Sequence, residues 1–169
     1  GIAEDVIPLL EPIKCEIKVI RKRPISLPGT VRTIQLEDLN VVLPTTDVLL
    51  IALALTDETE NLIGASELKL LPKDAVIVNV ARGKHIVTED LVKALTDNEI
   101  AGAALDVTDP EPLPAGPPLW NLPNCLITPH TANTPEMGIE LLSLRVTENV
   151  SRYLQGLDLI GCIDIDSGY

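Results

Sequence analysis

Short aliphatic runs, rich in valine, isoleucine and leucine, recur along the chain between more polar stretches. Several of them are continuously apolar, which is typical of parallel strands that are covered on both faces of a sheet. The pattern therefore predicts strands at residues 15–20, 47–55, 75–80, 101–106 and 125–128.

Segments with a helical pattern lie between these runs. In residues 88–96, Thr88 is a suitable N-cap, two acidic residues follow it at the positive end of the helix, and leucine and valine form an apolar face. The other segments are residues 3–10, 36–39, 65–70 and a final helix that begins at Thr134. This alternation of strands and helices predicts an α/β fold with a doubly wound parallel sheet.

The final helix has clear boundaries. Thr134 can cap it, Pro135 suits its first turn, and Gly156 is expected to end it. Apolar side chains recur along this helix at a spacing that predicts one apolar face. They are Ile139, Leu142, Val146, Val150, Tyr153 and Leu154.

A proline-rich segment, DPEPLPAGPPLWNLP at residues 109–123, separates the last two predicted strands. It holds six of the 14 prolines of the chain. Proline fixes φ and has no backbone N–H to donate to a sheet, so the segment is predicted to be a stiffened loop.

The composition indicates a globular protein with an aliphatic core. Apolar residues make up 46% of the chain and charged residues 22%, with no Phe, one Trp and two Tyr. No apolar run approaches the ~20 residues that a membrane-spanning helix needs, and the acidic N-terminus does not resemble a signal peptide. The net charge of −12 disfavours nucleic acid and anionic membranes as partners.

The cysteines do not indicate a cross-linked or metal-binding protein. Cys15, Cys125 and Cys162 are odd in number and widely spaced, which argues against a disulfide framework and against a zinc site. We therefore expect no metal site and a cytoplasmic, reducing location.

Basic residues gather at the start of this acidic chain. Six of the 13 lysines and arginines lie in the first 32 positions, at Lys14, Lys18, Arg21, Lys22, Arg23 and Arg32. Two interpretations are open at this point: a solvated run of charges and a local pocket for a phosphate group.

Chemically versatile side chains follow three of the predicted strands. Arg82 comes after residues 75–80, Asp106 and Glu111 come after the next run, and His130 comes after residues 125–128. Each has an ordinary alternative: a surface ion pair for Arg82, a turn cap for Asp106, a solvated acid for Glu111 and a loop histidine for His130. Because ligands bind beyond the carboxyl ends of parallel strands, their joint appearance predicts a site at this edge.

Three segments carry a resemblance to a known family. VNVARGKHIVTEDLVKAL, AALDVTDPEPLP and PLWNLPNCLITPHTAN resemble, in order and in spacing, the signature segments of the D-isomer-specific 2-hydroxyacid dehydrogenases. Members of this family reduce a 2-keto acid by hydride transfer from a nicotinamide cofactor, and also catalyse the reverse oxidation. The resemblance implies a Rossmann-like fold and a small 2-keto or 2-hydroxy acid as substrate.

The resemblance also implies catalytic roles for three residues. Arg82 would bind the substrate carboxylate, His130 would be the acid/base, and Glu111 would orient His130 and favour its protonated form. The related formate dehydrogenases carry glutamine where Glu111 stands, so formate is not the expected substrate.

The cofactor-binding residues implied by the resemblance begin at the first residue of the chain. Gly1-Ile2-Ala3 align with the last three positions of a GxGxxA turn, so the backbone of Gly1 and Ile2 would contact the pyrophosphate. NAD enzymes carry an acidic residue at the end of the second strand, where this chain has Arg21, Lys22 and Arg23. These cations would attract a 2′-phosphate, so NADP is the preferred cofactor and NAD a possible one.

Further cofactor contacts are carried over from the family onto the strand ends. Asp106 matches the residue that holds the nicotinamide carboxamide. The other positions are Leu53, Val80, Ala81, Arg82, His130, Thr131, Ala132 and Asn133.

Parts of the family's fold have no counterpart in these residues. The first strand, which lies in the middle of the family's sheet, and the smaller substrate-binding domain are missing, so we expect a truncated sheet with two unpaired strand edges. We expect the chain to be the C-terminal half of a longer, homodimeric protein and to bind cofactor poorly alone. Residues 1–154 would be a partial dinucleotide-binding domain, and residues 155–169 a C-terminal segment that returns toward the absent domain.

Two other kinds of function stay open on the sequence. One is a non-catalytic module that senses a dinucleotide or binds another protein, and the other is an inactive fragment. Retention of Arg82, Glu111 and His130 does not separate these from an enzyme, and the substrate side chain cannot be inferred from the sequence.

Overall fold

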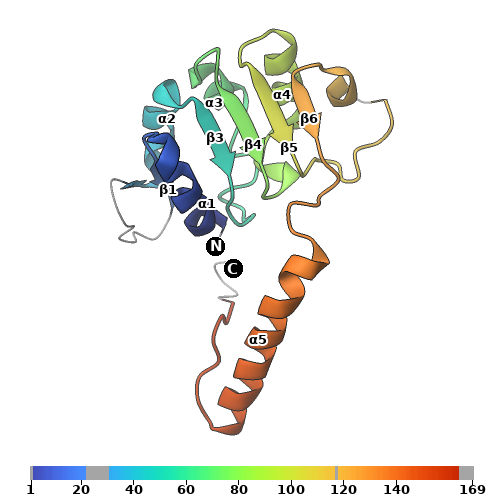
Figure 1. Cartoon of the computed structure of the whole chain (residues 1–169). Coiled ribbons are helices and arrows are strands. Elements are labelled where there is room, and N and C mark those ends of the chain that lie inside the picture. Colours follow the sequence, from blue (N-terminus) through green and yellow to red (C-terminus); the bar gives the residue numbers. More distant parts are fainter. Residues whose placement is uncertain (1, 22–30, 117, 164–169) are drawn as a thin grey trace.

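A computed structural model describes residues 2–21, 31–116 and 118–163 (Figure 1). All the strands in these ranges pair in parallel and form two separate sheets. In the first sheet, β1 (Lys18–Ile20) pairs with β2 (Arg32–Ile34). The second sheet has the order β3-β4-β5-β6, so that neighbours in sequence are neighbours in space. The predicted parallel α/β architecture is confirmed.

The second sheet contains the strands that precede the candidate catalytic residues. Its strands are β3 (Val48–Ile51), β4 (Val76–Asn79), β5 (Gly102–Leu105) and β6 (Cys125–Ile127). Each lies inside a predicted run, whereas β2 was not predicted. Its sequence, Arg-Thr-Ile, lacks the apolar run that indicated the other strands.

The two sheets are separated at the edges of β1 and β3. No described residue pairs with the free edge of either strand, and Val48 and Leu50 of β3 are 60% and 37% exposed. The expectation of two unpaired strand edges is therefore confirmed. Lys18 of β1 donates to the hydroxyl group of Thr45, 3.0 Å away in the segment that precedes β3.

Four of the five α-helices in the described ranges lie close to their predicted positions, but the helix predicted at residues 36–39 is mostly a 3₁₀ helix, and the α-helix there begins only at residue 39. The α-helices are α1 (Ile2–Leu10), α2 (Leu39–Val42), α3 (Ala65–Leu70), α4 (Thr88–Thr96) and α5 (Pro135–Leu154). Short 3₁₀ helices are η1 (Glu11–Ile13), η2 (Leu36–Asp38), η3 (Leu43–Thr45), η4 (Gly83–His85) and η5 (Pro118–Asn121). The predicted bounds of α3 and α4 match the structure.

The predicted N-cap of α4 is wrong. Val87 is the N-cap residue, and Thr88 is the first helical residue. The Thr88 hydroxyl instead donates to the backbone carbonyl of Asp109, 2.8 Å away in the loop after β5. At α5, Thr134 is the N-cap residue as predicted, although its side chain makes no capping hydrogen bond to the backbone. Gly156, with φ of 68°, follows the end of this helix as predicted.

The hydrophobic core lies on one face of the second sheet. Ile77 of β4 and Ala103 and Leu105 of β5 point to this face, where they join a single cluster with side chains of α3 and α4. The largest fully buried apolar side chains are Leu43, Ile63, Leu68, Ile77, Leu91, Leu95, Ile100 and Leu119. This core is aliphatic, as the composition predicts.

The other face of the same sheet is open, so the prediction that these strands are covered on both faces is wrong for the described residues. Val78 and Ala104 are half-buried there, and Leu126 is 65% exposed. The long helix α5 extends away from the sheet and does not cover this face (Figure 1). The predicted apolar residues of α5, from Ile139 to Leu154, are 53–79% exposed.

The segment after α5 turns back along the helix (Figure 1). Asn149 holds it at two points, since its side chain donates to the Ile160 carbonyl over 3.0 Å and accepts from the Ile160 N–H over 2.9 Å. Arg152 donates to the carbonyl of Asp158. Within the described ranges, no helix combines the length and the apolarity that a bilayer crossing requires.

The three thiols should differ in reactivity. Cys15 and Cys162 are exposed, whereas burial raises the pKa of the Cys125 thiol to about 11. Because the thiolate is the nucleophile, a disulfide reagent at pH 8 should modify Cys15 and Cys162 quickly and the half-buried Cys125 more slowly. Peptide mapping of the labelled protein measures this, with Cys125→Ser as the control. Equal labelling of all three cysteines would contradict the burial of Cys125.

Candidate active site

The loops after β4, β5 and β6 leave the sheet at the same edge, because the strands are parallel and adjacent. They carry Arg82, then Asp106 and Glu111, then His130. The residues predicted from separate parts of the sequence therefore come together at one edge of the second sheet. Their side chains differ, however, in how closely they approach one another.

Glu111 and His130 form a direct pair. The Nδ1 atom of His130 lies 2.5 Å from Oε1 of Glu111, and both side chains are partly exposed, His130 at 46% and Glu111 at 38%. The second carboxylate oxygen of Glu111 lies 3.5 Å from the N–H of Thr108. In the described part of the chain, Nε2 of His130 has no hydrogen-bond partner. The carboxylate therefore orients the ring and leaves Nε2 available to a ligand.

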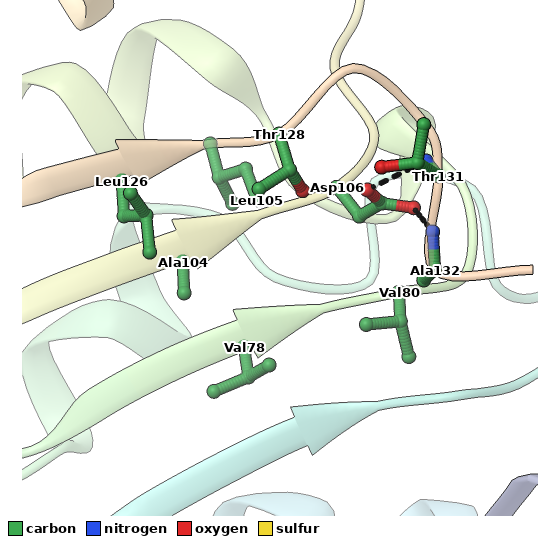
Figure 2. Close-up of a pocket in the computed structure, with 9 residues that line it drawn as sticks. All are labelled: Val78, Val80, Ala104, Leu105, Asp106, Leu126, Thr128, Thr131 and Ala132. Atoms are coloured by element: carbon green, nitrogen blue, oxygen red, sulfur yellow. Dashed lines mark hydrogen bonds between the residues drawn. The ribbon is translucent and has the colours of Figure 1, made fainter.

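Asp106 anchors the loop that carries His130 (Figure 2). Its Oδ1 accepts from the Thr128 hydroxyl over 2.5 Å and from the Thr131 N–H over 2.9 Å, and its Oδ2 accepts from the Ala132 N–H over 2.9 Å. Asp106 itself is only 6% exposed. The carboxylate thus holds the chain on both sides of His130.

The same contacts set the charge of Asp106. Burial alone raises the pKa of this carboxyl group, but the hydrogen bonds from Thr128, Ala132 and Thr131 outweigh burial and lower it below the ordinary value of 3.8. A nearby positive charge on His130 also lowers the pKa. Asp106 is therefore an anion at neutral pH, with its oxygens directed at the His130 loop.

His130 needs this anchoring because its backbone conformation is uncommon. Its φ is 54°, in the left-handed region that non-glycine residues rarely occupy. Its own N–H donates to the Thr128 carbonyl over 3.0 Å, across Pro129. The bonds to Asp106 on the following residues stabilise a conformation that the local sequence alone disfavours.

Arg82 lies at the expected edge but does not contact the Glu111–His130 pair in the described structure. Its side chain is exposed, and Nη1 donates to the carbonyl of Ala81 over 2.6 Å. The backbone around it is held by Asn79, whose side chain donates to the Arg82 carbonyl over 2.9 Å and accepts from the Ala81 N–H over 3.0 Å.

Asn79 is a site residue that the sequence analysis missed. It is completely buried at the end of β4, and its two hydrogen bonds shape the turn that presents Arg82. The signal was present in the sequence, since Asn79 is the only polar residue in the run AVIVNV. A buried amide has to be paired, so its place in a strand indicates a local backbone partner.

Gly83 brings the loop after β4 against the loop after β5. A Cβ atom at Gly83 would lie 2.0 Å from the carbonyl carbon of Thr108 and 2.1 Å from its oxygen. Only glycine permits this approach of two backbones. The contact fixes the position of the Arg82 turn relative to the segment between Asp106 and Glu111.

An open cavity of about 250 Å³ lies beside Asp106 on the uncovered face of the sheet (Figure 2). Four of the predicted cofactor contacts line it, namely Val80, Asp106, Thr131 and Ala132. The rest of its lining is Val78, Ala104, Leu105, Leu126 and Thr128. Its wall is mostly apolar, with one buried carboxylate at the end.

The other predicted cofactor residues are less closely grouped. Leu53 is half-buried in the loop after β3, Ala81 is buried beside Arg82, and Asn133 is exposed after the His130 loop. Ile2 is 49% exposed in α1, and Arg21 directly follows β1. Gly1, Lys22 and Arg23 lie outside the described residues. The structure therefore brings together the predicted residues at the ends of β4, β5 and β6.

Metal binding has no candidate site in the described ranges. Among these residues, no three His, Cys, Asp or Glu side chains gather in a way that could hold a metal ion. The acidic and histidine side chains of the candidate site contact one another or the backbone.

Comparison with known proteins relates the chain to one family. The sequence model described as "D-isomer specific 2-hydroxyacid dehydrogenase, NAD binding domain" matches residues 1–132. The chain is 38% identical, over all of its 169 residues, to 56% of an uncharacterized protein from Corynebacterium melassecola. It is 43% identical over 136 residues, which are 80% of this chain, to 40% of a glyoxylate reductase from Aeropyrum pernix.

Solved structures show the same relationship. A probable 2-hydroxyacid dehydrogenase from Rhizobium etli, in complex with NADP, HEPES and tartaric acid, superposes with a TM-score of 0.87 at 32% identity. The match covers 98% of this chain and 53% of that protein. The chain thus spans about half the length of the relatives that it matches.

Substitution of Gly83 should be strongly destabilising. In Gly83→Ala the new methyl group would overlap the Thr108 backbone, which has no flexible side chain to move aside, so a cost of about 3 kcal/mol is expected. Thermal or urea unfolding measures it. The matched control is Gly138→Ala in α5, where no atom lies within 4 Å of the added Cβ, and this variant should be neutral or slightly more stable. Equal stability of the two variants would contradict the close contact.

Asp106→Asn should destabilise the protein in a pH-dependent way. Asparagine cannot accept from all three donors, so a loss of about 2 kcal/mol is expected at pH 7. Since the folded-state pKa of Asp106 lies below 3.8, its contribution is present above that value and disappears as the pH falls through the folded-state pKa.

Urea unfolding between pH 3 and pH 7 tests this prediction. The control is Asp97→Asn at an exposed carboxylate, which should lower the free energy of unfolding by under about 0.5 kcal/mol. The difference between wild type and Asp106→Asn should shrink toward the acid end of the range. A difference that is constant across the range would exclude the anionic form of Asp106 as its cause.

Proposed function

Because the chain belongs to the D-isomer specific 2-hydroxyacid dehydrogenase family, we propose that its protein transfers hydride between a nicotinamide cofactor and a small 2-keto acid. The reverse reaction oxidises the corresponding 2-hydroxy acid. Residues 1–154 would be a partial dinucleotide-binding domain of this enzyme, and residues 155–169 a C-terminal segment that returns toward the substrate-binding domain.

The Glu111–His130 pair is the observation that carries this proposal. Reduction of a ketone needs a proton for the carbonyl oxygen as the hydride reaches the carbonyl carbon. His130 can donate this proton from Nε2, because Glu111 occupies Nδ1 and stabilises the positive charge of the protonated ring. After the transfer the ring is neutral and the product is an alcohol. In the oxidation direction the neutral ring accepts the proton again.

Arg82 would bind the carboxylate of the substrate. A guanidinium group can grip a carboxylate with two parallel hydrogen bonds, which also orients the adjacent carbonyl group. Arg82 is exposed at the same edge as His130, and its backbone is fixed by Asn79 and by the approach of Gly83 to Thr108. In the described part of the chain, the Arg82 guanidinium makes one hydrogen bond, to the carbonyl of Ala81. A bound anion can replace this bond.

NADP is the proposed cofactor, and NAD a weaker alternative. When bound, the nicotinamide supplies or accepts the hydride. The apolar cavity beside Asp106 suits one flat ring, and Asp106, Thr128 and Thr131 are the polar residues in its lining. Arg21 and the two basic residues after it favour a 2′-phosphate over two free ribose hydroxyls. The related Rhizobium etli protein is in complex with NADP.

The identity of the substrate and the oligomeric state are both proposals. The Aeropyrum pernix relative is a glyoxylate reductase, so glyoxylate is the first substrate to test, together with hydroxypyruvate and an aryl pyruvate. The homodimer and the cytoplasmic location expected from the sequence stay predictions.

The activity test is the oxidation of NADPH, followed by absorbance, in the presence of each keto acid. It is run on the 169-residue chain and on any longer product that its coding region specifies. His130→Asn should lower kcat/KM at least about 100-fold, because a general acid contributes that much or more. Arg82→Ala should mainly raise KM for the keto acid, and NADPH should be used more efficiently than NADH.

The control for Glu111→Gln is Glu89→Gln at an exposed position. Both substitutions remove one carboxylate, but only the Glu111 carboxylate contacts His130. Glu111→Gln should lower kcat, because the ring of His130 loses the carboxylate that orients it, whereas Glu89→Gln should leave kcat unchanged. NADPH binding without turnover of any keto acid, by every product tested, would favour the non-catalytic alternative. Tighter binding of NADH than of NADPH would contradict the proposed cofactor preference.

A further inference from the structure

His85 is a buried histidine for which the proposed reaction has no use. It is the last residue of η4 and is completely inaccessible to solvent, in contrast to His130. The chain has only these two histidines. The ring nitrogens of a fully buried histidine need hydrogen-bond partners within the protein.

Both ring nitrogens of His85 face backbone carbonyl oxygens. Nδ1 lies 2.9 Å from the carbonyl oxygen of Thr59, and Nε2 lies 3.2 Å from the carbonyl oxygen of Leu53. A carbonyl oxygen can only accept a hydrogen bond. A neutral imidazole has one N–H, so it could donate to one of these oxygens and would turn a lone pair toward the other.

We propose that His85 donates from both ring nitrogens, as an imidazolium, and is a positioning residue that closes the loop after β3 against the segment carrying Arg82. The two acceptors lie at opposite ends of this loop, at Leu53 and Thr59. Only the doubly protonated ring donates to both of them, and the ring itself is inaccessible to solvent.

The loop that supplies both acceptors carries no basic residue. Its titratable groups are Asp57 and Glu58, both acidic and exposed, and Glu60 follows directly after it. On the segment of His85 itself, Lys84 forms an ion pair with Glu60 over 3.1 Å, and Arg82 is exposed. The two carbonyl dipoles point their negative ends at the ring, which offsets part of the cost of burying the charge.

The rest of the loop is built around the same contact. Inside the loop, the Thr59 hydroxyl donates to the Ala54 carbonyl over 2.8 Å and accepts from the Thr56 N–H over 2.8 Å. Beyond it, backbone bonds join the two segments, from Asn61 to Lys84 and from Ile63 to His85. The ring therefore fixes the start of a loop whose later residues are already paired with its own segment.

This arrangement connects two parts of the candidate site. The backbone N–H of His85 donates to the carbonyl of Arg82 over 3.3 Å. The ring of His85 therefore lies one turn away from Arg82, the proposed carboxylate-binding residue. On the other side it holds Leu53, which is a cofactor contact in the proposed function. The effect on the cofactor thus rests on the proposed function, whereas the protonation of His85 does not.

The direct test is ¹⁵N NMR of the chain with labelled histidine, with His130→Asn used to assign the two rings. At pH 7 both nitrogens of His85 should carry a proton, and both N–H signals should exchange slowly with solvent. A single N–H on the His85 ring would overturn the proposal. This measurement uses the wild-type protein, so it does not depend on the folding of any His85 variant.

A pair of substitutions tests the positioning role. In His85→Gln the side-chain amide can donate near the position of Nε2, toward Leu53, whereas in His85→Asn it can donate only near Nδ1, toward Thr59. His85→Gln should therefore bind NADPH about fivefold more tightly than His85→Asn. Lys84→Gln, a surface change in the same segment, should bind like the wild type.

The outcomes separate the two proposals. Equal NADPH affinities of His85→Gln and His85→Asn, in a wild type that binds NADPH, would overturn the positioning role. Failure of the wild type to bind NADPH would count against the proposed function, and the NMR result would still decide the state of His85.

Discussion

The carboxylate of Asp106 is the group on which the candidate site depends. It is buried at the end of β5 and accepts three hydrogen bonds from the loop after β6, on both sides of His130. Without these bonds the left-handed conformation of His130 would have no support, because the local sequence does not favour it. Asp106 thus fixes the position of His130 relative to Glu111, which lies further along the same loop after β5.

The same arrangement occurs at each neighbouring strand end. Asn79 at the end of β4 shapes the turn of Arg82, and His85 holds the loop after β3. All three groups are buried and polar, and each is paired with backbone atoms, which avoids the cost of an unsatisfied buried group. Loops at a ligand-binding edge are exposed and would otherwise be mobile. Buried polar side chains behind them allow the exposed groups of the candidate site to keep a defined position.

Sequence patterns predicted the elements well where the pattern was local. The bounds of α3 and α4 follow from apolar periodicity, and four aliphatic runs contain the strands of the second sheet. The short strand β2 was missed because Arg-Thr-Ile has no apolar run of its own. Coverage of both sheet faces was wrong for the described residues, because apolar periodicity indicates that a strand can be covered and does not specify which element lies on each face.

By itself, the sequence determined the parallel α/β architecture, the edge at which Arg82, Asp106, Glu111 and His130 emerge, and the family. These follow from local periodicity and from the order of motifs along the chain. Only the tertiary structure decided which of these residues meet: Glu111 reaches His130, while Arg82 stays apart. It also showed the anchoring roles of Asn79 and His85. The physical reason is that a hydrogen bond needs partners within about 3 Å, and Asp106, Glu111 and His85 find theirs 19 to 32 residues away in sequence.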